Sequence, residues 1–144
     1  MARITRTIMI HAPVEKVFAF AGDAARLVEW WPSMQEVRNV QPLPGGGQCF
    51  DWTYRMAGIP VNGSGKHVEW IPNQLLVTEN RGGIPSRFVW NFQSLGDETR
   101  LTMQTEYKLV GALARLAEPM VVRLNEHETD IILANLKAQM EKGE

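Results

Sequence analysis

The chain has 144 residues, of which 44% are hydrophobic and 22% are charged, and its formal net charge is -1. This length and composition are typical of a globular protein with a sizeable core, so we expect residues 1–144 to form a single domain. The balanced charge excludes a global field for nucleic acid or anionic lipid, and no stretch is apolar enough to span a membrane. One cysteine, Cys49, excludes an internal disulfide framework. We therefore expect a cytoplasmic protein that does not bind nucleic acid and does not insert into membranes.

The N-terminal part of the chain predicts one strand followed by two short helices. Apolar and polar residues alternate over residues 3–10, which indicates a half-buried strand. Pro13 suits the first turn of a helix, apolar residues follow at helical spacing, and Gly22 ends this helix. Asp23 can cap a second short helix, which ends before Pro32.

The middle of the chain predicts a meander of antiparallel strands. Segments with strand-like alternation are separated by turns rich in glycine, proline, asparagine and aspartate, and each turn is too short for a parallel crossover. The predicted strands are residues 35–41, 48–56, 61–71, 75–80, 87–94 and 99–109.

The last segment, residues 113–141, predicts one long helix with an apolar side and a charged side. Pro119 falls inside it, so we expect a kink or a broken first turn there. The residues that share the apolar side of a helical wheel are Leu113, Leu116, Met120, Val121, Leu124, Ile131 and Ile132.

Several short signatures occur in this order along nearly the whole chain, and together they resemble the START/polyketide-cyclase superfamily. They are Ile-His-Ala-Pro-Val-Glu-Lys-Val-Phe-Ala-Phe at residues 10–20, Asp23 followed by Trp30-Trp31-Pro32, Trp90 and Phe92 before Asp-Glu-Thr-Arg-Leu-Thr at 97–102, Glu106-Tyr107, and Leu136-Lys137 near the end of the long helix.

This resemblance implies an α+β helix-grip fold. A seven-stranded, strongly curved antiparallel sheet would wrap the long C-terminal helix, and the two short helices after the first strand would close one end. Members of the superfamily bind sterols, lipids, plant hormones or polyketides in a cavity, and some catalyse cyclisation, dehydration or hydroxylation there. Because one fold serves several functions, the function has to be argued from the site.

The predicted strands carry aromatic residues on one face, which we expect to be the concave face of the sheet. Such a face predicts a pocket for a flat or elongated apolar molecule, and the alternative is that these side chains fill a plain core. The residues expected to contact a ligand are Trp31, Trp52, Tyr54, Met56, Trp90, Phe92, Met103, Tyr107, Met120, Leu124 and Glu128.

Ionisable side chains near the apolar side of the long helix suggest chemistry in the same cavity. His127 and Glu128 lie on or beside that side, and Tyr54 and Tyr107 belong to the aromatic faces, so these four are the candidates for a general acid or base. The alternative is that His127 and Glu128 reach solvent, or that Glu128 pairs with an arginine of the sheet. His67 and Glu69 alternate with Val68 and Trp70, but the pattern does not decide which pair points into the cavity.

The sequence contains no pattern that would hold a metal ion or a phosphate. The three histidines have no metal-like spacing, there is no paired cysteine motif, and no P-loop or nucleophile elbow is present, so we expect no metal and no cofactor. The absence of paired cysteines and histidines also excludes the iron–sulfur oxygenase branch of the superfamily.

Two functions follow from these observations. The first is a monomeric or homodimeric protein that carries or sequesters a small apolar molecule. The second is a polyketide cyclase/dehydrase-type enzyme, which would need acid and base groups inside the cavity. A third possibility, a role in protein–protein contact, would require a large exposed apolar patch.

Overall fold

The computed structural model describes residues 2–56, 58–108 and 118–142. In this part of the chain, seven strands form one antiparallel sheet in the order β1-β7-β6-β5-β4-β3-β2. The strands are β1 (Ala2–Ile10), β2 (Met34–Pro42), β3 (Gln48–Met56), β4 (Ile59–Ile71), β5 (Leu75–Gly82), β6 (Ser86–Leu95) and β7 (Glu98–Tyr107). The helices are α1 (Val14–Ala21), the 3-10 helix η1 (Ala24–Glu29) and α2 (Glu118–Glu141).

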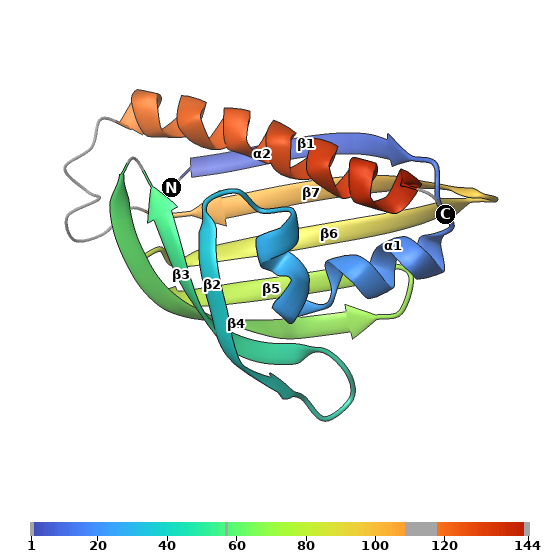
Figure 1. Ribbon diagram of the computed structural model, residues 1–144, viewed down its shortest axis with the longest axis horizontal. Coiled ribbons are helices and arrows are strands. Elements are labelled where there is room, and N and C mark those ends of the chain that lie inside the picture. The colour runs from blue at the N-terminus through green and yellow to red at the C-terminus, as the bar shows by residue number, and fades with distance from the viewer. Residues whose placement is uncertain (1, 57, 109–117, 143–144) are drawn as a thin grey trace.

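The arrangement of these elements confirms the predicted α+β helix-grip fold. The sheet curves so that α2 lies along its β1 edge, while α1 and η1 cover the concave side next to it (Figure 1). Every pair of neighbouring strands is antiparallel, as the short turns predicted. The concave side is therefore enclosed between the sheet and the helices.

The ends of the short helices follow from local chemistry. The Asp23 side chain accepts a hydrogen bond from the backbone N–H of Ala25 at 3.3 Å, as expected of a helix cap. In α2, Pro119 is the second of the described helical residues, and proline is tolerated in the first turn of a helix. The predicted beginning of this helix at residues 113–117 lies outside the described residues.

A β-bulge in β4 changes which residues of that strand share a face, compared with the prediction from the sequence. The pairing with β5 shifts register between His67 and Glu69, so the strict alternation of sides is broken there. As a result His67 and Trp70 stack on each other, with ring centroids 5.4 Å apart, while Glu69 is exposed. The prediction that His67 and Glu69 share a face opposite Trp70 was wrong, because a bulge adds one residue to the count.

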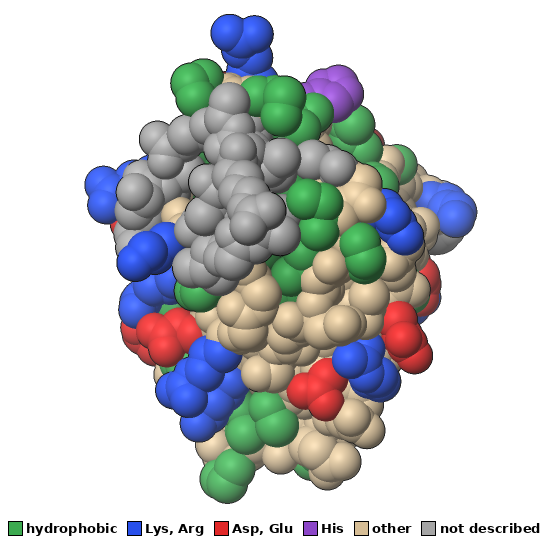
Figure 2. Space-filling view, turned by 90° about the vertical axis from the view of Figure 1, so that its left-hand side faces the viewer, with side chains coloured by type: hydrophobic (Ala, Val, Ile, Leu, Met, Phe, Trp, Pro, Cys, Tyr) green, Lys and Arg blue, Asp and Glu red, His purple; other side chains and the backbone are tan. Residues whose placement is uncertain are grey.

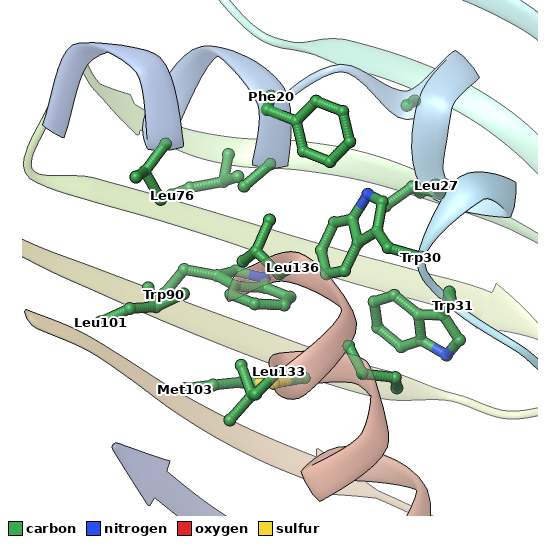
Figure 3. Packing of buried hydrophobic residues seen from close by; sticks show 14 of the residues in the cluster. Phe20, Leu27, Trp30, Trp31, Leu76, Trp90, Leu101, Met103, Leu133 and Leu136 are labelled. Atoms are coloured by element: carbon green, nitrogen blue, oxygen red, sulfur yellow. The ribbon is translucent and has the colours of Figure 1, made fainter. Parts of the chain in front are cut away.

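The core lies between α2, the short helices and the concave face of the sheet. In α2 the buried apolar residues follow helical spacing and end at Met140. Figure 3 shows Leu133 and Leu136 on the side of α2 that faces Trp90 and Met103 of the sheet. Leu136 and Leu101 are both fully buried at 0% exposure. Burial of these apolar side chains of α2 holds the helix against the concave face of the sheet.

Polar contacts fix α2 along β1 at several points. Arg6 donates to Asp130 at 2.9 Å, and Lys137 donates to the carbonyl oxygen of Met9 at 2.9 Å. The carboxylate of Glu141 accepts the backbone N–H of His11 at 2.8 Å. These contacts set the position of the helix relative to the cavity.

Within the described residues, no helix has the length and apolar character needed to cross a membrane.

Candidate functional site

A cavity of about 90 Å³ lies between the concave face of the sheet and the chain that leads from η1 into β2. This volume is several times the space that one buried water molecule needs. Strands β3 to β7 supply most of the wall, η1 and the start of β2 close it, and α2 contributes Asn125. Because side chains alternate along each strand, the curved sheet places one face of every strand on this space.

Aromatic rings form the greater part of the wall. Trp31 packs against Phe88 and Trp90, with ring centroids 5.2 and 6.2 Å away. On β3, Trp52 and Tyr54 lie edge to face, with centroids 6.4 Å apart. Rings in these arrangements offer a broad, flat apolar surface.

The position of Trp31 is set by the end of η1. The carbonyl oxygen of Trp30, the residue that ends η1, accepts a hydrogen bond from the Asn135 side chain of α2 at 3.2 Å. The polar side chain of Asn135 on α2 therefore has a structural role: it ties η1 to the long helix and so places Trp31 over the sheet.

A glycine opposite Trp52 leaves room for its indole ring. Gly63 of β4 pairs with Trp52, and a Cβ atom at Gly63 would come within 2.4 Å of the indole ring and of the carbonyl oxygen of Arg81. Real Cβ contacts are never so short. The absence of a side chain at Gly63 is therefore a condition for this part of the wall.

Some of the polar side chains in the wall satisfy one another. The Trp52 indole N–H donates to Asn80 at 3.1 Å, and the Asn80 amide donates to Ser86 at 3.0 Å. The Asn125 amide donates to the hydroxyl of Tyr107 at 3.2 Å. These groups are hydrogen-bonded without a ligand.

Tyr54 and Glu128 form a contact that joins an ionisable group of α2 to the wall. The Tyr54 hydroxyl donates to the carboxylate of Glu128. Burial of the phenol, together with the negative charge and hydrogen bond of Glu128, raises the pKa of Tyr54 well above its usual value, and Trp31 and Ser33 oppose this only in part. Tyr54 is therefore a protonated donor whose proton is already engaged.

His67 faces the cavity as a neutral imidazole. It is 7% exposed, and its burial lowers the pKa from 6.5 to about 4. Its Nδ1 lies 2.9 Å from the backbone N of Gln48 and accepts that N–H. The single proton of the neutral ring is therefore on Nε2, which makes Nε2 a hydrogen-bond donor.

Several of the sequence-predicted ligand contacts are placed together on the wall. Glu128 does not line the cavity itself, but it accepts a hydrogen bond from the lining residue Tyr54. Those that line the cavity are Trp31, Trp52, Tyr54, Met56, Trp90 and Tyr107. Phe92 and Met103 do not line it; both are buried in the core, where Phe92 packs against Phe18 at 5.0 Å.

Three predicted residues of α2 point away from the cavity. Met120 and Leu124 are 47% and 45% exposed, and His127 is exposed as well. At 100° per residue, Leu124, Met120 and His127 lie about 120°, 160° and 180° around the helix from the buried Leu136. The helical wheel drawn over the whole predicted helix therefore put these three residues on the wrong side. Figure 2, which views the molecule from the end where α2 begins, shows hydrophobic side chains exposed on that face.

Sequence reasoning missed several polar members of the wall. Thr78 and Asn80 share a face of β5 with Leu76, and Ser86 lies opposite Asn80 on β6. The alternation of positions 76, 78 and 80 was the signal that could have found the first two. Among the described residues, no group of histidine, cysteine, aspartate and glutamate side chains could hold a metal ion.

A seven-stranded antiparallel sheet that curves around a long helix, with an aromatic cavity between them, defines a START-like helix-grip protein. The particular family follows from the sequence: the model of the family described as polyketide cyclase / dehydrase and lipid transport matches residues 1–141. The chain belongs to this family. No curated protein matches the sequence significantly.

Solved structures with the same fold cover almost the whole chain. A protein of Thermus thermophilus is 20% identical, with a TM-score of 0.83 over 96% of this chain and 97% of that one. A START superfamily protein from Mycobacterium smegmatis is 14% identical, with a TM-score of 0.83 over 97% of both chains. The Zhui aromatase/cyclase of a Streptomyces species is 13% identical, with a TM-score of 0.81 over 98% of this chain and 94% of that one. These likenesses establish the fold alone.

Proposed function

We propose that this protein binds a small apolar molecule in the aromatic cavity and carries or sequesters it. The observation that carries the proposal is the wall itself, which is lined by the aromatic rings of Trp31, Phe88 and Trp90 and by those of Trp52 and Tyr54. Concave apolar sites with a few polar groups are typical of small-molecule binding. Membership of a family that includes lipid transport supports the same function.

A second candidate function is catalysis of the cyclase/dehydrase type in the same cavity. It is favoured by the hydrogen bond between Tyr54 and Glu128 and by the neutral imidazole of His67, which lines the same cavity. A general acid and a base placed beside one apolar cavity are the minimum that such chemistry requires. His127, a candidate in the sequence, is exposed and has no place in this arrangement.

Native mass spectrometry of the purified protein, followed by extraction and analysis of whatever it holds, separates the two functions. For a carrier we expect a bound molecule that is recovered chemically unchanged after incubation. Recovery of a converted product would instead establish an enzyme. Failure to hold any apolar compound from a panel of fatty acids, sterols and aromatic polyketides would contradict both.

The Trp90→Ala variant tests the wall directly. Trp90 is 4% exposed and lines the cavity, so its loss is expected to weaken ligand binding by about 1–3 kcal/mol. The control is Trp70→Ala, which removes the same kind of ring from a residue that stacks on His67 but does not itself line the cavity, so its effect on the affinity is expected to be smaller than that of Trp90→Ala. Calorimetric titration of both folded variants provides the comparison, and equal affinities would remove Trp90 from the site.

A further inference from the structure

One row of side chains crosses the concave wall of the cavity from β4 to β7. In the antiparallel register, His67 lies opposite Thr78, Thr78 opposite Phe88, and Phe88 opposite Thr105. All four residues line the cavity. Since neighbouring strands are roughly 4.8 Å apart, the row extends over roughly 14 Å. Polar groups therefore stand along the width of an otherwise aromatic wall.

Two polar groups around Phe88 are buried without a hydrogen-bond partner. The Thr105 hydroxyl is one, and the indole N–H of Trp31, whose ring packs on Phe88, is the other. The Trp31 N–H lies near enough to Tyr54 to influence its pKa, but it makes no hydrogen bond within normal distance and angle limits. Trp31 and Thr105 are only 6% and 7% exposed. Because an unpaired buried polar group costs free energy, both sites favour a ligand that completes them.

These groups, and the Nε2–H of His67 further along the row, can all donate a hydrogen bond. An indole N–H can only donate, and a hydroxyl can do so by rotation. A ligand oxygen that accepts hydrogen bonds is therefore the complement of this wall. A ligand cation would meet the positive ends of the same N–H and O–H groups.

A ligand carboxylate would find no cation among the described residues that line the cavity. The lining residues of the described chain include no lysine or arginine, and the imidazole of His67 is neutral. The carboxylate of Glu128, bound to the Tyr54 hydroxyl, adds a negative charge beside the cavity. Burial of a carboxylate without a partner is costly, and a second carboxylate nearby raises that cost.

We propose that the cavity takes an uncharged, flat aromatic molecule whose carbonyl or ether oxygen accepts hydrogen bonds from Trp31 and Thr105, and that it rejects carboxylates. This inference rests on the proposed binding function and specifies its ligand chemistry. The rings of Trp31, Phe88 and Trp90 supply the apolar contact, and the unpaired donors supply the orientation. Fatty acids are thereby excluded as ligands.

Three naphthalenes of similar size, substituted at the same ring position, test the ligand chemistry. Acetylnaphthalene carries a neutral acceptor oxygen, ethylnaphthalene carries none, and naphthoate carries a charge at neutral pH. In calorimetric titrations we expect acetylnaphthalene to bind about tenfold more tightly, or better, than either of the others. If ethylnaphthalene or naphthoate binds as tightly, the inference is overturned although the cavity still binds ligands. If none of the three binds, the proposed function itself is contradicted.

Two variants test which donors are responsible. Thr105→Val removes the hydroxyl with little change of shape, and Trp31→Phe removes the N–H but keeps a ring. Each is expected to reduce the preference for acetylnaphthalene over ethylnaphthalene, measured within each variant as the ratio of the two affinities. The control is Thr102→Val, on β7 outside the cavity lining, which should keep the full preference. An undiminished preference in both folded test variants would overturn the assignment.

Discussion

The Leu136→Ala variant is expected to lower the free energy of unfolding by about 2–5 kcal/mol, which is the range for a fully buried leucine that leaves a cavity behind. Leu136 is 0% exposed and lies on the side of α2 that faces the sheet. Together with Ile132, Leu133 and Met140, it forms the buried apolar side of the helix. Urea denaturation of the folded variant measures the change.

Leu124→Ala is the matched control, since it makes the same substitution in the same helix. Leu124 is 45% exposed, so its loss is expected to change the free energy of unfolding by only about 0.5 kcal/mol or less. The pair of variants also tests the corrected orientation of α2. Equal losses at the two positions would mean that the helix does not present Leu136 to the core.

The stability of the protein is expected to fall as the pH is lowered from about 6.5 to about 4, because of His67. In the unfolded chain this imidazole takes up a proton near pH 6.5, whereas burial lowers its pKa in the folded protein to about 4. Between these values the unfolded state binds more protons, so acid favours unfolding. The loss amounts to about 3 kcal/mol at pH 4, at 1.36 kcal/mol for each unit of pKa difference.

Denaturation measured across this pH range in two variants isolates the contribution of His67. His67→Gln keeps an acceptor for the backbone N–H of Gln48 but cannot titrate, so the acid-dependent loss should become smaller by about 3 kcal/mol. His127→Gln changes an exposed histidine and should leave the pH dependence as it is in the parent. The same pH dependence in His67→Gln would show that His67 does not control it.

The fold could be predicted from the sequence because its signals are local. Alternation, turn residues and caps such as Asp23 each act over a few residues, and they indicated every strand and helix of the described chain within a few positions. The antiparallel direction of the neighbouring strands from β2 to β7 then follows from their short connections. Strand parity likewise placed Trp52, Tyr54 and Trp90 on the concave face, and all three line the cavity.

The details of the site depended on features that a local pattern does not contain. The bulge in β4 put Trp70 on the same side as His67 and left Glu69 exposed, and it is a property of the pairing with β5. The buried side of α2 is set by contact with the sheet, so a wheel alone put Met120 and Leu124 on the wrong side. The partners of Asn80, Tyr107 and Glu128 come from other elements of the fold. Contacts between residues that are far apart in the sequence cannot be predicted from local patterns.

The most direct test of the proposed binding cavity is an NMR titration of isotope-labelled methionine methyl groups with acetylnaphthalene. Met34 and Met56 line the cavity, whereas Met120 is exposed and Met140 is buried elsewhere in the core. If the ligand occupies the cavity, ring currents from its aromatic system will shift the Met34 and Met56 signals and leave those of Met120 and Met140 in place. Shifts confined to Met120, or no shifts at saturating ligand, would contradict the account.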